Sequence, residues 1–369
     1  MRLTTRRAAL AGLTTMAMVG MLAACASAPD AAPAPSASGA TESQAPATNA
    51  DFLGCMVSDS GGFDDKSFNQ LGFEGLKEAS AALGTQFKQA ESQSDTDFAP
   101  NINNLIDQGC NLIVTVGFNL AAATDDAAKA NKDINFAIID DNSIDLPNVK
   151  PLVYDTAQAA FLAGYAAASY STSKIVGTFG GLPIPPVTIF MDGFVDGVNY
   201  YNEKNKDTVE VKGWDVKSQN GSFTGGFAAG TDAKQAAQTL IDAGADVILP
   251  VGGPIFLSAA EAIRDASKPI ALIGVDADVF ETNPENSDLF LTSIMKGIKP
   301  GVEEVTKAAA DGKFDSTPYI GTLENGGVGI APFHDYESKI NPDLQAELSA
   351  ITADIIAGTI KVESPSSPK

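Results

Sequence analysis

The segment 59–70, which reads Asp-Ser-Gly-Gly-Phe-Asp-Asp-Lys-Ser-Phe-Asn-Gln, gathers side chains suited to binding a small polar molecule. It supplies carboxylates at Asp59, Asp64 and Asp65, an amide at Asn69, and aromatic rings at Phe63 and Phe68. Carboxylates accept hydrogen bonds but repel phosphate. The segment therefore predicts a site for a polar, flat ligand rather than for a phosphate. An acidic turn with Ser67 as a helix N-cap is the structural alternative.

The elements around this segment place it where a strand ends. An apolar run at 52–57 precedes it, and a helix-like segment begins near Ser67. In open α/β sheets, ligands bind at the carboxyl ends of strands. Other apolar runs also end in glycine or aspartate, at Gly117, Asp140, Asp141, Gly252, Gly253, Asp276 and Asp278. Such residues also simply terminate strands, but their recurrence at four strand ends predicts a ligand cleft.

Strand-like and helix-like segments alternate along the whole chain after residue 50. Continuous apolar runs lie at 52–57, 112–116, 136–139, 152–154, 175–179, 247–251 and 270–275, with alanine-rich stretches of helical spacing between them. This alternation is typical of an α/β protein whose parallel sheets are covered on both faces. The two halves of the chain show the same alternation of strand-like and helix-like segments, which predicts two similar α/β lobes.

Asp276 and Lys296 form a second candidate pair. Asp276 follows one apolar run, and Lys296 follows the next, at 291–295. If the two runs form neighbouring strands, both side chains can point into one crevice. A carboxylate and an ammonium can there hold the vicinal hydroxyls of a ribose. Each charged hydrogen bond contributes roughly 1.5–3 kcal/mol. A structural ion pair between lobes is the alternative.

Catalysis and metal binding find little support. The sole histidine, His334, lies far from every strand-end cluster, which favours a surface or packing role. No Ser/His/Asp set, nucleophile elbow or phosphate-binding glycine loop is present. The two cysteines beyond Cys25 and the one histidine cannot form a standard tetrahedral zinc site without carboxylates, and 276–288 lacks EF-hand spacing. We expect binding without turnover, and no cofactor, metal or catalytic residue.

The first 50 residues predict export and anchoring. Basic residues precede an apolar run at 8–24, as in an export signal, and Arg6-Arg7 leaves the twin-arginine and general secretory routes both open. Leu22-Ala-Ala-Cys25 resembles the bacterial lipobox, in which the cysteine is lipidated. Residues 26–50 are rich in Ala, Pro, Ser and Thr and predict a disordered tether. We expect a protein anchored outside the cytoplasm, on the membrane surface.

The net charge limits the classes of binding partner. At −22, it argues against nucleic acid, whose binding depends on cationic contacts with phosphates.

Two cysteines of the folded part can form a disulfide. Cys55 lies in the first apolar run and Cys110 just before another. Export permits a disulfide, and the pair comes within range if the first and third strands are neighbours. Two buried thiols remain the alternative.

Several segments together resemble the basic membrane protein family of bacterial solute-binding lipoproteins, whose members include purine-nucleoside receptors of ABC transporters. The matching pieces are 62–70, Phe161-Leu-Ala-Gly-Tyr165, Gly180-Gly181 with Ile184-Pro185, Gly193-Phe-Val-Asp-Gly197, Gly244-Ala-Asp-Val-Ile248, Gly274-Val-Asp276, Met295-Lys296 and Asn325-Gly-Gly-Val-Gly329. They extend from about residue 52 to 330. The resemblance implies a type I periplasmic-binding-protein fold with two doubly wound lobes joined by three crossovers.

The resemblance also implies lobe boundaries and ligand contacts. Residues 51–155 with about 280–335 would form the first lobe, and 156–279 with about 336–365 the second. Asp59 and Asp140 would bind the base, with Asn69 nearby. Phe68 and Phe227 would stack on the base, Asp276 and Lys296 would hold the ribose, and the Gly252 backbone would lie close. Phe223 is the alternative to Phe227, and Asp141 the alternative to Asp140.

We therefore expect a lipid-anchored, monomeric receptor that delivers a purine nucleoside to the permease and ATPase subunits of an ABC importer. A receptor of the same fold for a sugar or another small polar solute is the nearest alternative. A nucleoside-processing enzyme and a surface antigen without a transport role are more distant ones.

Overall fold

The computed structural model describes residues 51–369, which belong to one compact unit. The predicted leader, the lipidated Cys25 and the tether lie outside the described residues. Among the residues described, no helix combines the length and apolar character that crossing a membrane requires.

The first sheet has the strand order β13-β5-β4-β3-β1-β2, and all its neighbours pair in parallel. Its strands are β1 (Leu53–Ser58), β2 (Gln86–Ala90), β3 (Leu112–Val116), β4 (Asn135–Ile139), β5 (Val149–Tyr154) and β13 (Tyr319–Gly321). Alternate residues of β1 enter different hydrophobic clusters, Met56 on one face and Cys55 with Val57 on the other. The sheet is therefore buried on both faces, which explains its unbroken apolar runs.

The second sheet has the order β14-β12-β11-β10-β6-β7. Its strands are β6 (Ile175–Gly180), β7 (Glu210–Lys212), β10 (Val247–Val251), β11 (Ala271–Asp276), β12 (Phe290–Lys296) and β14 (Val328–Ile330). Only β14 is antiparallel among these pairs of the described chain. A two-stranded ribbon of β8 (Trp214–Asp215) and β9 (Asn220–Gly221) forms a separate small sheet beside β6. The two parallel α/β lobes confirm the predicted fold class.

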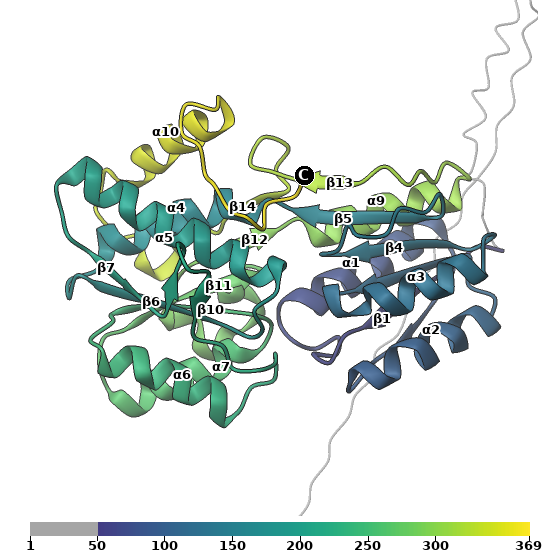
Figure 1. The fold of residues 1–369 in the computed structure, drawn as a ribbon, viewed down its shortest axis with the longest axis horizontal. Coiled ribbons are helices and arrows are strands. Elements are labelled where there is room, and N and C mark those ends of the chain that lie inside the picture. Colours follow the sequence, from purple (N-terminus) through teal and green to yellow (C-terminus); the bar gives the residue numbers. More distant parts are fainter. Residues whose placement is uncertain (1–50) are drawn as a thin grey trace, which may run out of the picture. The chain divides into compact units, whose positions relative to one another are not determined.

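Helices cover both faces of each sheet (Figure 1). Around the first sheet lie α1 (Phe68–Leu83), α2 (Phe98–Asp107), α3 (Ala121–Ala130) and α9 (Ile298–Ala310). Around the second lie α4 (Thr156–Tyr170), α5 (Pro185–Asn205), α6 (Thr231–Asp242), α7 (Ile255–Ala266), α8 (Val279–Thr282) and α10 (Leu344–Ile356). Figure 1 shows α4 and α5 on one side of β6 and β10, with α6 and α7 on the other.

The packing of α4 against α5 depends on glycines that the family resemblance had singled out. A Cβ atom on Gly193 would collide with the backbone of Ala157, and one on Gly197 with the backbone of Phe161. Gly164 faces Phe194 in the same way. These motifs therefore bring two helix backbones into close contact rather than binding a ligand.

The chain crosses between the sheets three times. It leaves the first sheet after β5 to enter α4, returns after β12 to form α9 and β13, and leaves again between β13 and β14. The predicted boundary near residue 280 differs from this pairing, because β12 pairs with β11 in the second sheet. An apolar strand does not reveal which of two similar sheets it joins. We propose a first lobe of 51–155 with 298–321, and a second of 156–296 with 328–369.

Cys55 and Cys110 are joined by a disulfide, with their Cα atoms 6.0 Å apart. The parallel pairing of β1 with β3 brings them together, as the neighbouring-strand argument expected. Both are almost fully buried, at 0 and 2 % exposure. The bridge thus ties β1 to the residues just before β3, its neighbour in the first sheet.

Candidate functional site

A cleft lies at the carboxyl ends of strands from both sheets. It encloses about 550 Å³ of space not filled by atoms, part of it open to solvent. Every ligand-binding residue expected from the sequence lines it: Asp59, Phe68, Asn69, Asp140, Phe227, Gly252, Asp276 and Lys296. The alternatives Asp141 and Phe223 do not line it.

Asp65 shapes the loop that carries Asp59 and Phe68. Its carboxylate accepts hydrogen bonds from the backbone N–H groups of Ser67 (3.0 Å), Asn69 (2.9 Å) and Gln70 (3.1 Å). Asp65 thus satisfies the free N–H groups at the start of α1. Ser67 holds the N-cap position, as the structural alternative had it, but its side chain makes no capping hydrogen bond.

Ser67 instead connects the lobes. Its Oγ donates to the Val275 carbonyl at 2.7 Å, at the end of β11. A second bond between lobes runs from the Thr282 hydroxyl to the Lys66 carbonyl, at 2.6 Å. These bonds hold the α1 loop of the first lobe against the second lobe beside the cleft.

Asp59 and Asn69 form the acceptor group of the first lobe. Asp59 Oδ1 accepts from Asn69 Nδ2 at 2.7 Å and from the Gly61 N–H at 3.1 Å. Burial raises the pKa of Asp59 to about 6, although these two hydrogen bonds act to lower it. Asn69 Oδ1 is buried and has no hydrogen-bond partner within the described chain. Asn69 therefore leaves a free acceptor atom beside Asp59.

Lys296 stands between two carboxylates at the centre of the cleft. Its Nζ lies 2.6 Å from Asp140 Oδ2 and 3.2 Å from Asp276 Oδ1, and the three side chains are 3 to 7 % exposed. Burial raises the pKa of Asp140 to about 6, against the lowering effect of Lys296. Burial acts to lower the pKa of Lys296, but Asp140 and Asp276 outweigh it and the pKa is raised. One ammonium thus serves two buried carboxylates.

Aromatic rings surround this charged centre from both lobes. The Lys296 ammonium lies 5.1 Å from the ring centroids of Phe68 and Phe190, within cation–π range. Phe227 packs against Gly181 and Gly252, where a Cβ atom would collide with its ring. Gly252 also has a φ of +135°, which glycine tolerates best. The ring of Phe223 packs instead on Trp214, at 5.8 Å between centroids.

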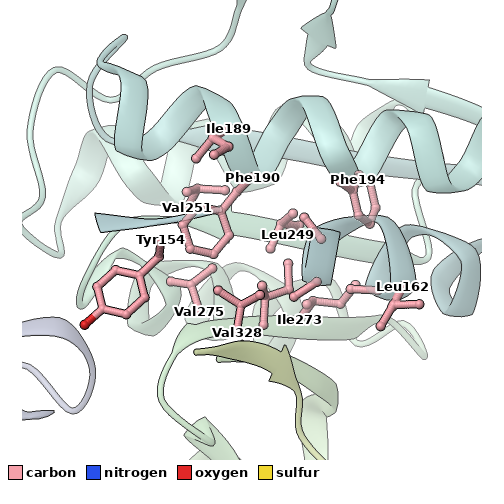
Figure 2. Close-up of a cluster of buried hydrophobic side chains, with 14 of the residues drawn as sticks. Tyr154, Leu162, Ile189, Phe190, Phe194, Leu249, Val251, Ile273, Val275 and Val328 are labelled. Atoms are coloured by element: carbon pink, nitrogen blue, oxygen red, sulfur yellow. The ribbon is translucent and has the colours of Figure 1, made fainter. Parts of the chain in front are cut away.

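Sequence reasoning missed several residues of the cleft. Phe190, on α5, is 1 % exposed and lines the cleft, as does Val251. Figure 2 shows both residues in the hydrophobic cluster behind it. Phe118 and Asn119 also line the cleft, directly after Gly117. No feature of the sequence marked Phe190 as a cleft residue, because a phenylalanine on the buried face of a helix is usual in any hydrophobic core. The position of Phe118 after a strand-ending glycine was a signal that could have found it.

His334 does not line the cleft. Its ring stacks on Phe280 with centroids 4.0 Å apart, and Nε2 lies 2.8 Å from Asp278 Oδ2. Of the surface and packing roles expected, the structure shows the packing one, but the expected distance from every strand-end cluster is wrong, because Asp278 belongs to one of them. Within residues 51–369, no group of three or more His, Cys, Asp or Glu side chains is arranged to hold a metal ion.

Comparisons with known proteins agree with this architecture. The family model Bmp, described as "ABC transporter substrate-binding protein PnrA-like", matches residues 52–366. The "ABC transporter nucleoside-binding protein BmpA" of Lactococcus lactis subsp. cremoris (strain MG1363) is 28% identical over 331 residues, covering 85% of this chain and 90% of the relative. The "CD4+ T-cell-stimulating antigen" of Listeria monocytogenes serovar 1/2a (strain ATCC BAA-679 / EGD-e) is 28% identical over 329 residues, covering 85% and 88%.

A solved structure shares the fold. The ABC transporter system solute-binding protein from Aeropyrum pernix K1 has a TM-score of 0.76 at 23% identity, covering 85% of this chain and 94% of that one. The fold is thus of the type I periplasmic-binding-protein kind, as expected.

The family match covers nearly all of the described residues. Because the family consists of substrate-binding proteins of ABC transporters, the protein binds a solute for a transporter and is not an enzyme. Such proteins work outside the cytoplasm in association with the membrane. The chain belongs to the Bmp family of PnrA-like ABC transporter substrate-binding proteins.

Proposed function

We propose that the protein is a lipid-anchored receptor that captures a purine nucleoside and delivers it to the permease and ATPase subunits of an ABC importer. One observation carries the proposal: Phe68 and Phe227, from opposite lobes, line the same cleft as the buried group of Asp140, Lys296 and Asp276. Rings from two lobes suit a flat base, and the charged group suits a ribose.

The base would stack between Phe68 and Phe227. Stacking of a base on an aromatic side chain contributes about 1–3 kcal/mol in nucleic-acid binders. Since each lobe supplies one ring, a bound base favours the closed arrangement of the lobes over an open one. Asp59 and Asp140 would accept hydrogen bonds from the donors of the base, with the free Oδ1 of Asn69 beside Asp59.

The ribose would lie against Asp276 and Lys296. Asp276 Oδ1 is buried and 3.2 Å from the ammonium, yet it makes no hydrogen bond within the described residues. It can therefore accept from a ribose hydroxyl, while Lys296 donates to a ribose oxygen. The cleft contains more carboxylates than cations, and their negative charges repel a phosphate. The ligand is therefore a nucleoside rather than a nucleotide.

The name of the Lactococcus relative, a nucleoside-binding protein, supports this ligand class. Anchoring through Cys25 rests on the lipobox-like Leu22–Cys25 sequence. Labelling cells with a fatty-acid analogue tests the anchor: the wild-type protein should carry the label, whereas a Cys25→Ser variant should not.

Isothermal titration calorimetry tests the ligand. Guanosine, adenosine, inosine, free ribose and glucose would each be titrated into purified protein. We expect at least one purine nucleoside to bind about 100-fold more tightly than ribose or glucose, because the stacking and base-edge contacts are absent from the sugars. Sugar binding without nucleoside binding would favour a sugar receptor of the same fold instead.

A further inference from the structure

A second cavity adjoins the ligand cleft on the side where Lys296 stands. It encloses about 840 Å³ of space not filled by atoms, part of it open to solvent. The two cavities share Phe118, Asp140, Pro186 and Lys296 in their walls. A ligand held against Lys296 therefore faces this second cavity.

Residues 365–369 form one wall of the second cavity, and the segment 363–369 passes over α5 toward the start of α4. Three hydroxyl groups hold it in place: Ser364 Oγ donates to Asp192 Oδ2 at 2.6 Å, Ser366 Oγ pairs with Thr188 Oγ1 at 2.8 Å, and Ser367 Oγ donates to Asp155 Oδ1 at 2.8 Å. Figure 1 shows the segment running from α10 to a position beside β13. This wall is thus fixed by specific bonds.

Thr156 provides an unused polar group in another wall. It is the first residue of α4, it lines the second cavity, and it is 0 % exposed. Its Oγ1 atom has no hydrogen-bond partner among the described residues. Since buried polar groups nearly always have a partner, this hydroxyl is available to a ligand.

The charges of the cavity determine which ligand group fits. Asp140 and Asp141 contribute carboxylates, and Asp141 is only 4 % exposed. Lys296 is already paired with Asp140 and Asp276, and Lys369, the other lysine of the lining, is exposed. The buried part of the cavity thus has no unpaired cation for a phosphate, whereas hydroxyl and amide groups can both donate to a carboxylate and bind Thr156.

We propose that the second cavity is an extension of the ligand site that takes a neutral, polar substituent on the 5′ carbon of a purine nucleoside. This inference rests on the proposed function. If Asp276 holds the vicinal hydroxyls of the ribose, the 5′ carbon is the part of the sugar left to extend past Lys296 into the cavity. The receptor then accepts 5′-modified nucleosides as well as unmodified ones.

Three probes test the extension by calorimetry: adenosine, its 5′-N-ethylcarboxamide derivative, and adenosine 5′-monophosphate. We expect the carboxamide to bind within about threefold of adenosine, and the monophosphate about 100-fold more weakly because its charge opposes Asp140 and Asp141. Adenosine binding with rejection of the carboxamide overturns the extension alone. Absence of binding by adenosine, guanosine and inosine overturns the proposed function and the extension with it.

Two variants locate the substituent. Thr156→Val should raise the Kd of the carboxamide relative to that of adenosine by about fivefold, the loss expected for one hydrogen bond. Thr306→Val is the matched control, because Thr306 is also 0 % exposed with an unpartnered Oγ1 but lines neither cavity. Equal ratios in the two variants would contradict the placement.

Asn142→Trp gives an independent check. Asn142 is exposed and lines the second cavity, so a large side chain there fills space without disturbing the core. We expect the carboxamide to lose at least about tenfold in affinity relative to adenosine. An unchanged ratio, with the thermal midpoint also unchanged, would contradict occupation of the cavity.

Discussion

Asp140 and Asp276 occupy equivalent places in the two lobes, and their carboxylates face the same ammonium. Asp140 follows β4 and Asp276 ends β11, which are corresponding strands in the orders β2-β1-β3-β4 and β7-β6-β10-β11. Both residues have a φ of 68°, in the left-handed region that aspartate tolerates better than most residues. The repeated topology thus brings two identical side chains to one point, where Lys296 of the second lobe joins the pair.

Removal of this ammonium should destabilise the protein. Lys296→Met leaves two buried carboxylates without their cation, and breaking a buried pair in this way costs about 3–5 kcal/mol. We expect a loss of that size in the free energy of urea unfolding at pH 7. The loss should shrink at pH 5, because protonation neutralises the buried carboxylates.

The triple variant Asp140→Asn/Asp276→Asn/Lys296→Met is the control for this effect. It removes the charges together, so it should be more stable than Lys296→Met at pH 7. If Lys296→Met alone unfolds like the wild type, the group of three residues is not an important ionic contact of the folded protein.

Ligand affinity should depend on pH through Asp59 and Asp140. Burial raises both pKa values to about 6, and each carboxylate would accept a hydrogen bond from the ligand only with its proton removed. Affinity should therefore rise with pH, by at least about tenfold between pH 5 and 7, as measured by calorimetry with the preferred nucleoside. Asp59→Asn should bind more weakly at pH 7 and show a shallower pH dependence, because only Asp140 still titrates.

The unliganded protein should show the opposite trend in stability. Its folded state keeps protons on Asp59 and Asp140 up to about pH 6, whereas the unfolded state releases them near the ordinary carboxyl pKa of about 4. The contribution of these two groups to stability therefore falls as pH rises through that window. Asp59→Asn should flatten the dependence in urea titrations at pH 4 to 7; an unchanged slope would contradict the assigned pKa.

Two phenylalanines a few residues apart should behave differently. Phe227→Ala removes a ring that lines the cleft and should weaken nucleoside binding by at least about tenfold. Phe223→Ala removes a ring packed on Trp214, so it should lower the thermal midpoint with little change in affinity. Phe68→Ala should resemble Phe227→Ala. The reverse result for Phe223 and Phe227 would show that the stacking ring is assigned to the wrong residue.

The disulfide should stabilise the fold without contributing to binding. Its cysteines are 55 positions apart, and closing a loop of that length in the unfolded chain stabilises the folded state by about 4 kcal/mol in the chain-entropy model. We expect Cys55→Ala/Cys110→Ala to lower the unfolding free energy by an amount of this order and to leave nucleoside affinity unchanged. A large affinity loss in a folded variant would link the bridge to the site.

The sequence predicted the fold through the strongest patterns. Runs such as 112–116 and 247–251 are long, apolar and bounded by glycine, so they identified buried parallel strands. The edge strand β14 has three residues and includes Gly329, too short for any periodicity to appear. The sheet to which β12 belongs could not be read from its composition, because both sheets bury their strands on two faces.

The site was predictable where it coincided with strand ends and with family motifs. Asp59, Asp140 and Asp276 follow strands directly, and their positions carried the prediction. The capping role of Asp65 depends on the folded geometry of a loop, which residue types alone do not fix. The approach of 363–369 to Asp155 joins segments about two hundred residues apart, and no local pattern reports such a contact.

A crystal structure with a purine nucleoside bound is the decisive measurement. We expect the base to lie between the rings of Phe68 and Phe227, and ribose oxygens to lie within hydrogen-bond distance of Asp276 and Lys296. A cleft that stays empty at saturating guanosine, adenosine or inosine, or a nucleoside bound away from both rings, would contradict it.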